Sequence, residues 1–126
     1  AGSVITYGAV ASACERARDW RAAVDILVQM RQATVEPNTV VFNAAIAACE
    51  KGRRWAAAVS LLNEMIIQRV VVDIISYNAT ISACEKGHQW SMAVDLLHDL
   101  PRQSLKANAI TCSAAISALE KGHQWP

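Results

Sequence analysis

The sequence predicts an all-α fold, an α-solenoid of helix–turn–helix repeats with a period of 35 residues. A motif returns along the chain as GAVASACERARDW (8–20), NAAIAACEKGRRW (43–55), NATISACEKGHQW (78–90) and SAAISALEKGHQW (113–125). Tryptophan also recurs every 35 residues, at Trp20, Trp55, Trp90 and Trp125. A fixed period of roughly 20 to 50 residues is typical of repeat arrays. We therefore expect one array over 1–126, with repeats over about 4–38, 39–73 and 74–108 and a partial repeat over 109–126.

The composition suits a folded, helical chain. Hydrophobic residues make up 53% and charged residues 18% of the 126 residues, which excludes a disordered chain. The formal net charge of +1 argues neither for nor against a polyanionic partner. No run of about 18 uncharged apolar residues is present, so we expect no membrane span.

The cysteines recur with the repeat instead of forming pairs. Cys14, Cys49 and Cys84 hold the same place in successive repeats, and stacking would set them roughly 10 Å apart. A disulfide needs Cα atoms within about 7 Å, so we expect buried thiols and a reducing compartment. No cysteine or histidine pair has zinc spacing, and the histidines occupy positions expected to be solvated. We expect no metal and no cofactor.

The first helix of each repeat is expected to have two apolar faces, as the second repeat shows. Asn38 is a good N-cap and Gly52 a typical C-cap, which predicts a helix over about Thr39 to Lys51. Two apolar stripes follow from helical spacing, namely Phe42, Ile46 and Cys49, and Val41, Ala45 and Ala48. The remaining face must line a surface and carries Val40, Asn43, Ala47 and Glu50, with Lys51 at its edge.

The second helix of each repeat is expected to bury one stripe only. In the second repeat it begins near Arg54 or Trp55, and its apolar stripe is Trp55, Ala58, Val59, Leu62, Met65 and Ile66. Pro101 should end the third such helix at about Leu100. Within residues 66–75, the β-branched residues of 70–75 would be interpreted as a strand in isolation. The 35-residue period instead favours a helix end, a linker and the next helix start.

The partial repeat keeps a first helix, expected over Ala109 to Lys121, and the sequence stops before a second can form. Repeat arrays need capped ends. We therefore expect fraying at both ends, or end-to-end association with another copy. We interpret the chain as a piece of a longer array whose targeting segment lies outside it.

The paired helices, the period and an aromatic at the fourth place of the first helix resemble the pentatricopeptide repeat family. The openings VITYG (4–8), TVVFN (39–43) and IISYN (74–78), the alanines Ala23, Ala58 and Ala93, Met30 and Met65, and the Pro37–Asn38 close carry this resemblance over essentially the whole chain. Tetratricopeptide repeats have period 34 and another pattern. The recurring Trp, and Val72 and Ala107 in place of Pro, depart from the family, while ACEKG before Trp resembles repeats of algal members. The resemblance implies a right-handed superhelix.

The resemblance also implies binding of single-stranded RNA along the concave face, one base per repeat. Two residues per repeat would select the base, and the pairs are Gly8 with Asn38, Asn43 with Asp73, and Asn78 with Asn108, while Ser113 lacks its partner. The family pattern implies adenine, uracil and cytosine in that order. Ile5, Val40, Ile75 and Ile110 would wedge between bases, and Arg16, Lys51, Lys86 and Lys121 would contact phosphates.

Each of these positions has a simpler interpretation. Asn38, Asp73 and Asn108 are good N-caps whatever the ligand. Asn43 and Asn78 are polar first-turn residues on a solvent face. The β-branched residues could pack against the preceding repeat. The basic residues suit the helix macrodipole, and each follows a Glu that would cancel its charge.

The leading hypothesis is an RNA-binding module of an organellar RNA-processing or RNA-stabilising protein, located in a chloroplast or mitochondrion. A chain of this length and charge is expected to bind RNA weakly. The alternative is a helical-repeat scaffold that binds another protein. We expect no enzymatic activity, since no nucleophile–base pair recurs and no carboxylate cluster has metal spacing.

Overall fold

The computed structural model describes residues 4–121, except for the side chains of Leu119 and Lys121. Within this range the chain forms α-helices, one 3-10 turn and no strands. The elements are α1 (Val4–Arg16), α2 (Trp20–Gln32), α3 (Thr39–Lys51), α4 (Trp55–Ile67), α5 (Ile74–Lys86), α6 (Trp90–Asp99), η1 (Leu100–Gln103) and α7 (Ala109–Lys121). The all-α solenoid is confirmed, and α3 spans the residues expected from its caps. None of the described helices is long and apolar enough to cross a membrane.

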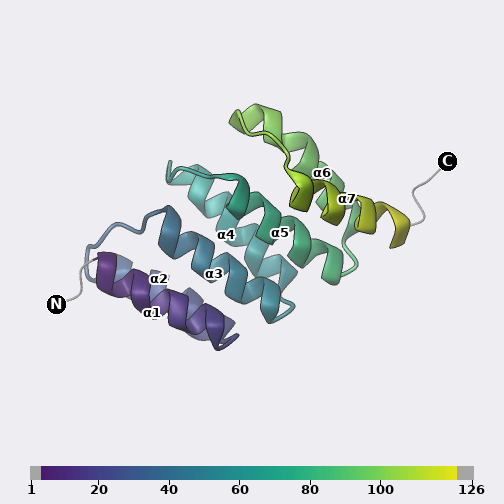
Figure 1. The fold of residues 1–126 in the computed structure, drawn as a ribbon. Coiled ribbons are helices and arrows are strands. Elements are labelled where there is room, and N and C mark those ends of the chain that lie inside the picture. The colour runs from purple at the N-terminus through teal and green to yellow at the C-terminus, as the bar shows by residue number, and fades with distance from the viewer. Residues whose placement is uncertain (1–3, 122–126) are drawn as a thin grey trace.

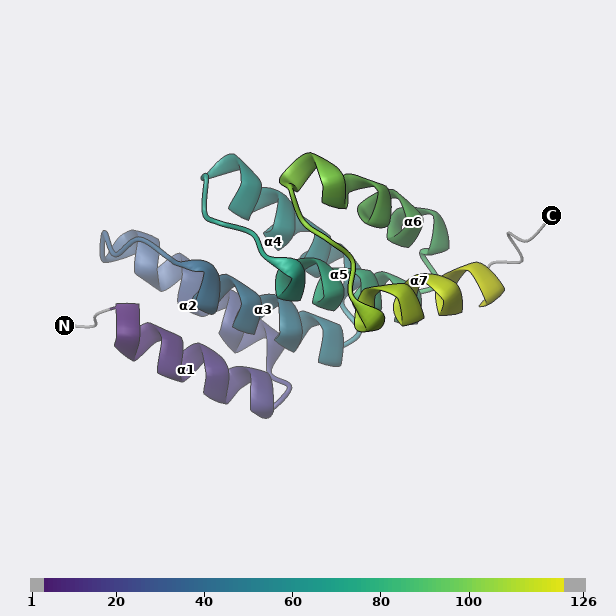
Figure 2. The same cartoon turned by 45° about the horizontal axis from the view of Figure 1, so that its top comes forward.

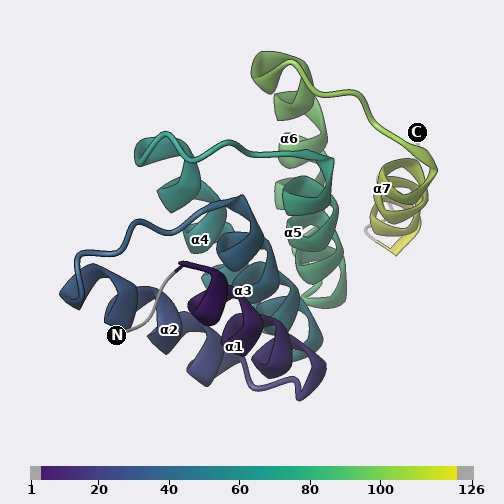
Figure 3. The same cartoon turned by 60° about the vertical axis from the view of Figure 1, so that its left-hand side comes forward.

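The helices form two layers (Figures 1 and 2). In the inner layer α1, α3, α5 and α7 lie side by side, and each packs on the next. In the outer layer α2, α4 and α6 each pack on the inner helix of their own repeat and on that of the following repeat, as Figure 3 shows from another side. Inner helices therefore have neighbours on several sides, which is why they need two apolar stripes.

Both predicted stripes of α3 are buried. The side chains of Phe42, Ile46 and Cys49 on one stripe, and of Val41, Ala45 and Ala48 on the other, are all 0% exposed. Residues 66–75 form the end of α4, a linker and the start of α5, as the period predicted. In α5 the aromatic at the fourth place, Tyr77, is also buried, and its hydroxyl donates to Asp99 Oδ2 at 2.9 Å.

Gly52 is the C-cap of α3, as the sequence predicted, but its backbone conformation does not explain why the residue is a glycine. Gly52 caps α3 with φ −83°, and the left-handed conformation falls on the next residue, Arg53, with φ 59°. The glycine is needed instead for space, because a Cβ on Gly52 would lie 2.7 Å from Cδ1 of Trp20. Likewise, a Cβ on Gly87 would lie 2.4 Å from Cδ1 of Trp55. Each glycine thus admits the tryptophan ring of the preceding repeat.

The third outer helix ends near the expected residue. The α-helix stops at Asp99, and the chain continues as the 3-10 turn η1, with Pro101 in its first positions. Proline lacks the N–H that would continue the α-helical hydrogen bonds, which explains the change. The expectation that no outer helix follows α7 concerns 122–126, which lie outside the described residues, as does Trp125.

The four cysteines are free thiols, and two of them predict a pH dependence of stability. Burial raises the pKa of Cys49 and of Cys84 from 9.0 to about 11. The contribution of the two thiols to stability is complete below their pKa in the unfolded chain. It is lost as pH rises through their higher pKa in the folded chain, because between these two pKa values the thiols ionise readily only in the unfolded chain. We expect a lower urea midpoint at pH 10 than at pH 8. A Cys49→Ala/Cys84→Ala variant should show a smaller decrease, and an equal decrease in both proteins would contradict this account.

Candidate nucleic-acid interface

Three shallow hollows recur along the inner layer, one for each pair of neighbouring inner helices. The first, between α1 and α3, has a volume of about 320 Å³ and contains Gly8 and Asn38 in its lining. The second, of about 340 Å³, contains Asn43 and Asp73. The third, of about 270 Å³, contains Asn78. The similar volumes and equivalent linings show that the surface repeats with the sequence.

Exposed β-branched side chains stand between the hollows. Ile5 is 81% exposed, Val40 60%, Ile75 60% and Ile110 66%. Val40 lines both the first and the second hollow, and Ile75 both the second and the third. Packing against the preceding repeat therefore does not account for these residues. Their apolar surface faces the solvent and is available to a flat ligand that enters a hollow.

Asn43 and Asp73 lie in direct contact beside the second hollow. Asp73 Oδ1 caps α5 by accepting from the Ser76 backbone N–H at 3.0 Å, and it also accepts from Asn43 Nδ2 at 3.1 Å. The Ser76 hydroxyl donates to Asn43 Oδ1 at 2.5 Å. Capping therefore turns Oδ1 of the aspartate towards the helix, and Oδ2 is left as a hydrogen-bond acceptor.

Asn78 and Asn108 repeat this arrangement at the third hollow. Asn108 Oδ1 accepts from the Thr111 backbone N–H at 3.0 Å and from Asn78 Nδ2 at 3.2 Å, and the Thr111 hydroxyl donates to Asn78 Oδ1. Because the cap requires the oxygen of Asn108, its amide nitrogen takes the place that Oδ2 has in Asp73. The second hollow thus offers an additional acceptor and the third an additional donor.

The first hollow has no such network. Asn38 Oδ1 caps α3 through the Val41 backbone N–H at 3.1 Å, but Gly8 brings no side chain to meet it. Ser113 of α7, for which no pairing residue was predicted, is exposed. The sequence-predicted sites therefore form two hydrogen-bonded pairs and one glycine–asparagine pair.

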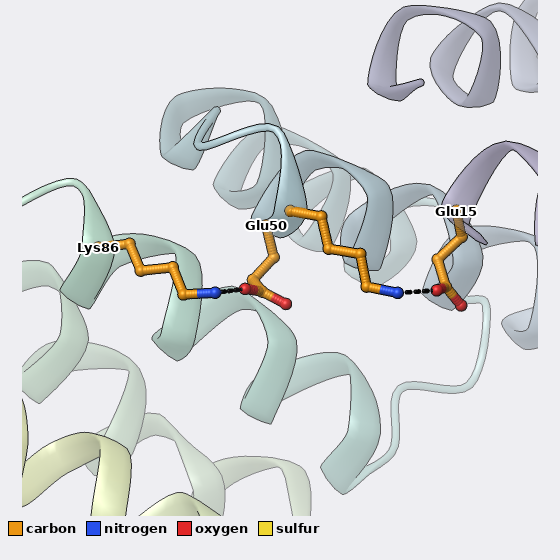
Figure 4. A network of polar contacts seen from close by, with 4 residues as sticks. Glu15, Glu50 and Lys86 are labelled. Atoms are coloured by element: carbon orange, nitrogen blue, oxygen red, sulfur yellow. Dashed lines mark hydrogen bonds and ion pairs between the residues drawn. The ribbon is translucent and has the colours of Figure 1, made fainter. Parts of the chain in front are cut away.

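Two of the basic residues expected to contact phosphates are ion-paired across repeats. Lys51 pairs with Glu15 of the preceding inner helix, and Lys86 pairs with Glu50 (Figure 4). The sequence predicted that the glutamate directly before each lysine would cancel its charge. The glutamate that does so belongs to the preceding repeat instead. Arg16 is exposed at the equivalent place in α1.

These ion pairs border the hollows. Glu15 contributes to the lining of the second hollow and Glu50 to that of the third. The side chain of Lys121, the fourth basic residue, lies outside the described side chains. Among the described residues, no three His, Cys, Asp or Glu side chains lie close enough together to hold a metal ion.

Sequence reasoning missed Ser76 and Thr111. Both occupy the third position of an inner helix and are buried, with 0% exposure. The available signal was a small hydroxyl residue three places after an N-cap, which is a known helix-start arrangement. The equivalent residue in α3 is Val41, which made this position look apolar.

Two layers of paired helices with one equivalent hollow per repeat define an α-solenoid with a repeating recognition surface. Models of one family match the sequence: the pentatricopeptide repeat domain matches residues 2–51, the PPR repeat family matches 37–86, and the PPR repeat matches 75–105. The chain therefore belongs to the pentatricopeptide repeat family. A search of curated proteins found no match.

Solved structures of this family share the fold. The pentatricopeptide repeat protein PPR10 in complex with an 18-nt psaJ RNA element superposes with a TM-score of 0.82 at 26% identity, over 94% of this chain. The PPR domain of Arabidopsis thaliana protein-only RNase P 1, in complex with tRNA, gives a TM-score of 0.82 at 14% identity, over 97% of this chain and 68% of that one. The chain spans only 18% of the PPR10 chain.

Proposed function

We propose that this chain is a single-stranded RNA-binding module that recognises one base per repeat on its inner layer. The contact between Asn43 and Asp73, repeated by Asn78 and Asn108, carries the proposal, because each pair converges beside a hollow. The likeness to PPR10, which was solved with bound RNA, supports it. By the same family resemblance, we propose that the parent protein acts in a chloroplast or mitochondrion.

The polarity of each pair gives a physical reason for base selection. Uracil carries an N–H donor at N3 between two carbonyl oxygens, so it complements Asp73 Oδ2 and the remaining N–H of Asn43. Cytosine carries an acceptor at N3 and an amino donor at N4, so it complements the Asn108 amide nitrogen. A wrong base would bring acceptor against acceptor or donor against donor, which costs a buried hydrogen bond.

The β-branched side chains would hold the bases by contact with their faces. Ile75 stands between the second and third hollows and would separate the bases bound there. Binding by this chain alone should be weak, because the formal net charge is +1 and both Lys51 and Lys86 are already paired. Apolar contacts of this kind would equally suit a peptide, which makes protein binding the second candidate.

Replacing Asp73 with Asn should change the preferred base at the second repeat from uracil to cytosine. Asparagine caps a helix as well as aspartate does, so its oxygen stays on the helix end and its amide nitrogen replaces Oδ2. We expect the ratio of the two affinities to shift by about tenfold, which is 1.4 kcal/mol. Titrations followed by NMR suit the weak affinity. Each RNA carries three bases in the order of the three pairs: A first, U or C at the centre, and C last. Each sequence is tested in both strand directions.

The third repeat supplies the control. The preference between cytosine and uracil opposite Asn78 and Asn108 should be the same before and after the Asp73→Asn change. Equal binding of both central bases by the original chain would reject base recognition at this pair. Binding of peptides without any binding of RNA would favour the scaffold instead.

A further inference from the structure

The hydroxyl of Ser76 occupies the centre of the hydrogen-bond network at the second hollow. Its Oγ lies 2.5 Å from Asn43 Oδ1, 3.0 Å from Asp73 Oδ1 and 3.3 Å from the Asp73 backbone nitrogen, which donates to it. Asn43 Oδ1 is the nearest acceptor for its single hydrogen. Ser76 is 0% exposed, so this hydroxyl cannot contact a ligand itself.

This contact fixes the orientation of the Asn43 amide. The oxygen is held by Ser76, and one N–H is held by Asp73 Oδ1 at 3.1 Å, so the second N–H is left for the hollow. The reversed amide would place its oxygen against the acceptor Oδ1 of Asp73. Without the hydroxyl, Oδ1 would lose its partner and the side chain could rotate away. Ordering a mobile side chain on binding reduces affinity and selectivity.

We propose that Ser76, and Thr111 one repeat later, are positioning residues that complete each base-selecting pair into a set of three. In each set the hydroxyl comes from the third position of the next inner helix and holds the asparagine in its base-recognising orientation. The proposal rests on the proposed function for its effect on RNA, but the orientation of the amide can be measured without RNA.

The three interfaces between inner helices in the described part of the chain agree with this assignment. Asn43 faces Ser76, and Asn78 faces Thr111, whose hydroxyl donates to Asn78 Oδ1. At the first interface there is no asparagine to orient, since Gly8 holds that place, and there the hydroxyl is replaced by Val41. Hydroxyl and asparagine thus occur together or not at all.

The test compares Ser76→Ala with Ser76→Thr. Alanine removes the hydroxyl, whereas threonine keeps it and is the residue found at the equivalent position 111. The quantity to compare is the ratio of the affinity for RNA with central uracil to that for RNA with central cytosine. We expect this ratio to fall about threefold to tenfold in Ser76→Ala, because Asn43 loses one hydrogen bond. Ser76→Thr should restore it. The preference at the third repeat should not change in either variant.

A measurement without RNA keeps the inference separate from the proposed function. The NMR order parameter of the Asn43 side-chain amide should fall in Ser76→Ala and recover in Ser76→Thr, while that of Asn78 stays constant. An unchanged order parameter for Asn43 would overturn the inference, whatever the chain binds. If the original chain selects uracil and Ser76→Ala selects it equally well, the inference alone fails. If the original chain selects no base, the proposed function fails.

Discussion

Replacing Gly87 with Ala is expected to destabilise the fold by about 1–3 kcal/mol, although alanine loses less backbone freedom on folding than glycine. The added Cβ would lie 2.4 Å from Cδ1, 2.9 Å from Cγ and 3.2 Å from Cβ of Trp55. These atoms belong to the ring and its point of attachment, so relief requires a shift of the ring or of helix α4. Urea unfolding followed by circular dichroism measures the change.

Gly8→Ala is the matched control. Gly8 is a buried glycine of the inner layer, and a Cβ there would lie 3.9 Å from Val41 Cγ2, which is an ordinary contact. That variant should be stabilised by about 0.5–1 kcal/mol, because alanine has less backbone freedom to lose. In a Trp55→Ala background the cost of Gly87→Ala should decrease. If Gly87→Ala were as stable as the original chain, the glycine would have no role in admitting the ring.

The repeat period was sufficient to place the helices. Each of Trp20, Trp55 and Trp90 is the first residue of an outer helix, and α3 spans the residues between its two expected caps. What the sequence could not show is contact between repeats. Gly52 was predicted as a C-cap because glycine is common there, and it is the C-cap of α3, but the reason for the glycine lies in another repeat. Its actual neighbour is a tryptophan 32 residues earlier, and the left-handed position falls on an arginine.

In the candidate site, too, the sequence predicted some features, whereas contacts between repeats were missed. Asn43 and Asp73 were paired from the family resemblance, and the structure places them in contact. Their partner Ser76 was missed, because its place three residues after the Asp73 cap indicates a helix start but not a contact with Asn43, which lies 33 residues earlier. The partner of Lys51 was assigned to the adjacent Glu50, but stacking brings Glu15 to it instead. Local sequence therefore predicts helices and caps well, whereas polar contacts across repeats require coordinates.

The glutamates beside the hollows are expected to restrain non-specific RNA binding. Glu50 pairs with Lys86 and lines the third hollow, so it neutralises a cation and also places negative charge where RNA would bind. Glu50→Gln should free Lys86 for a phosphate. Each phosphate contact adds about 0.7 to the slope of log affinity against log salt for single strands, so the slope should steepen by about that amount. A Glu15→Gln/Glu50→Gln variant should steepen it by about 1.4.

Glu64→Gln provides the control because it changes the net charge equally in the outer layer. Glu64 pairs with Arg31 of the neighbouring outer helix, away from the hollows. Removing that carboxylate frees a cation that cannot reach RNA on the inner layer, so the salt slope should not change. Pairs at the surface contribute only about 0–1 kcal/mol, so all these variants should remain folded. Equal slopes for Glu50→Gln and Glu64→Gln would mean that only overall charge matters. A steeper slope for Glu50→Gln alone would locate the phosphate path beside the paired lysines.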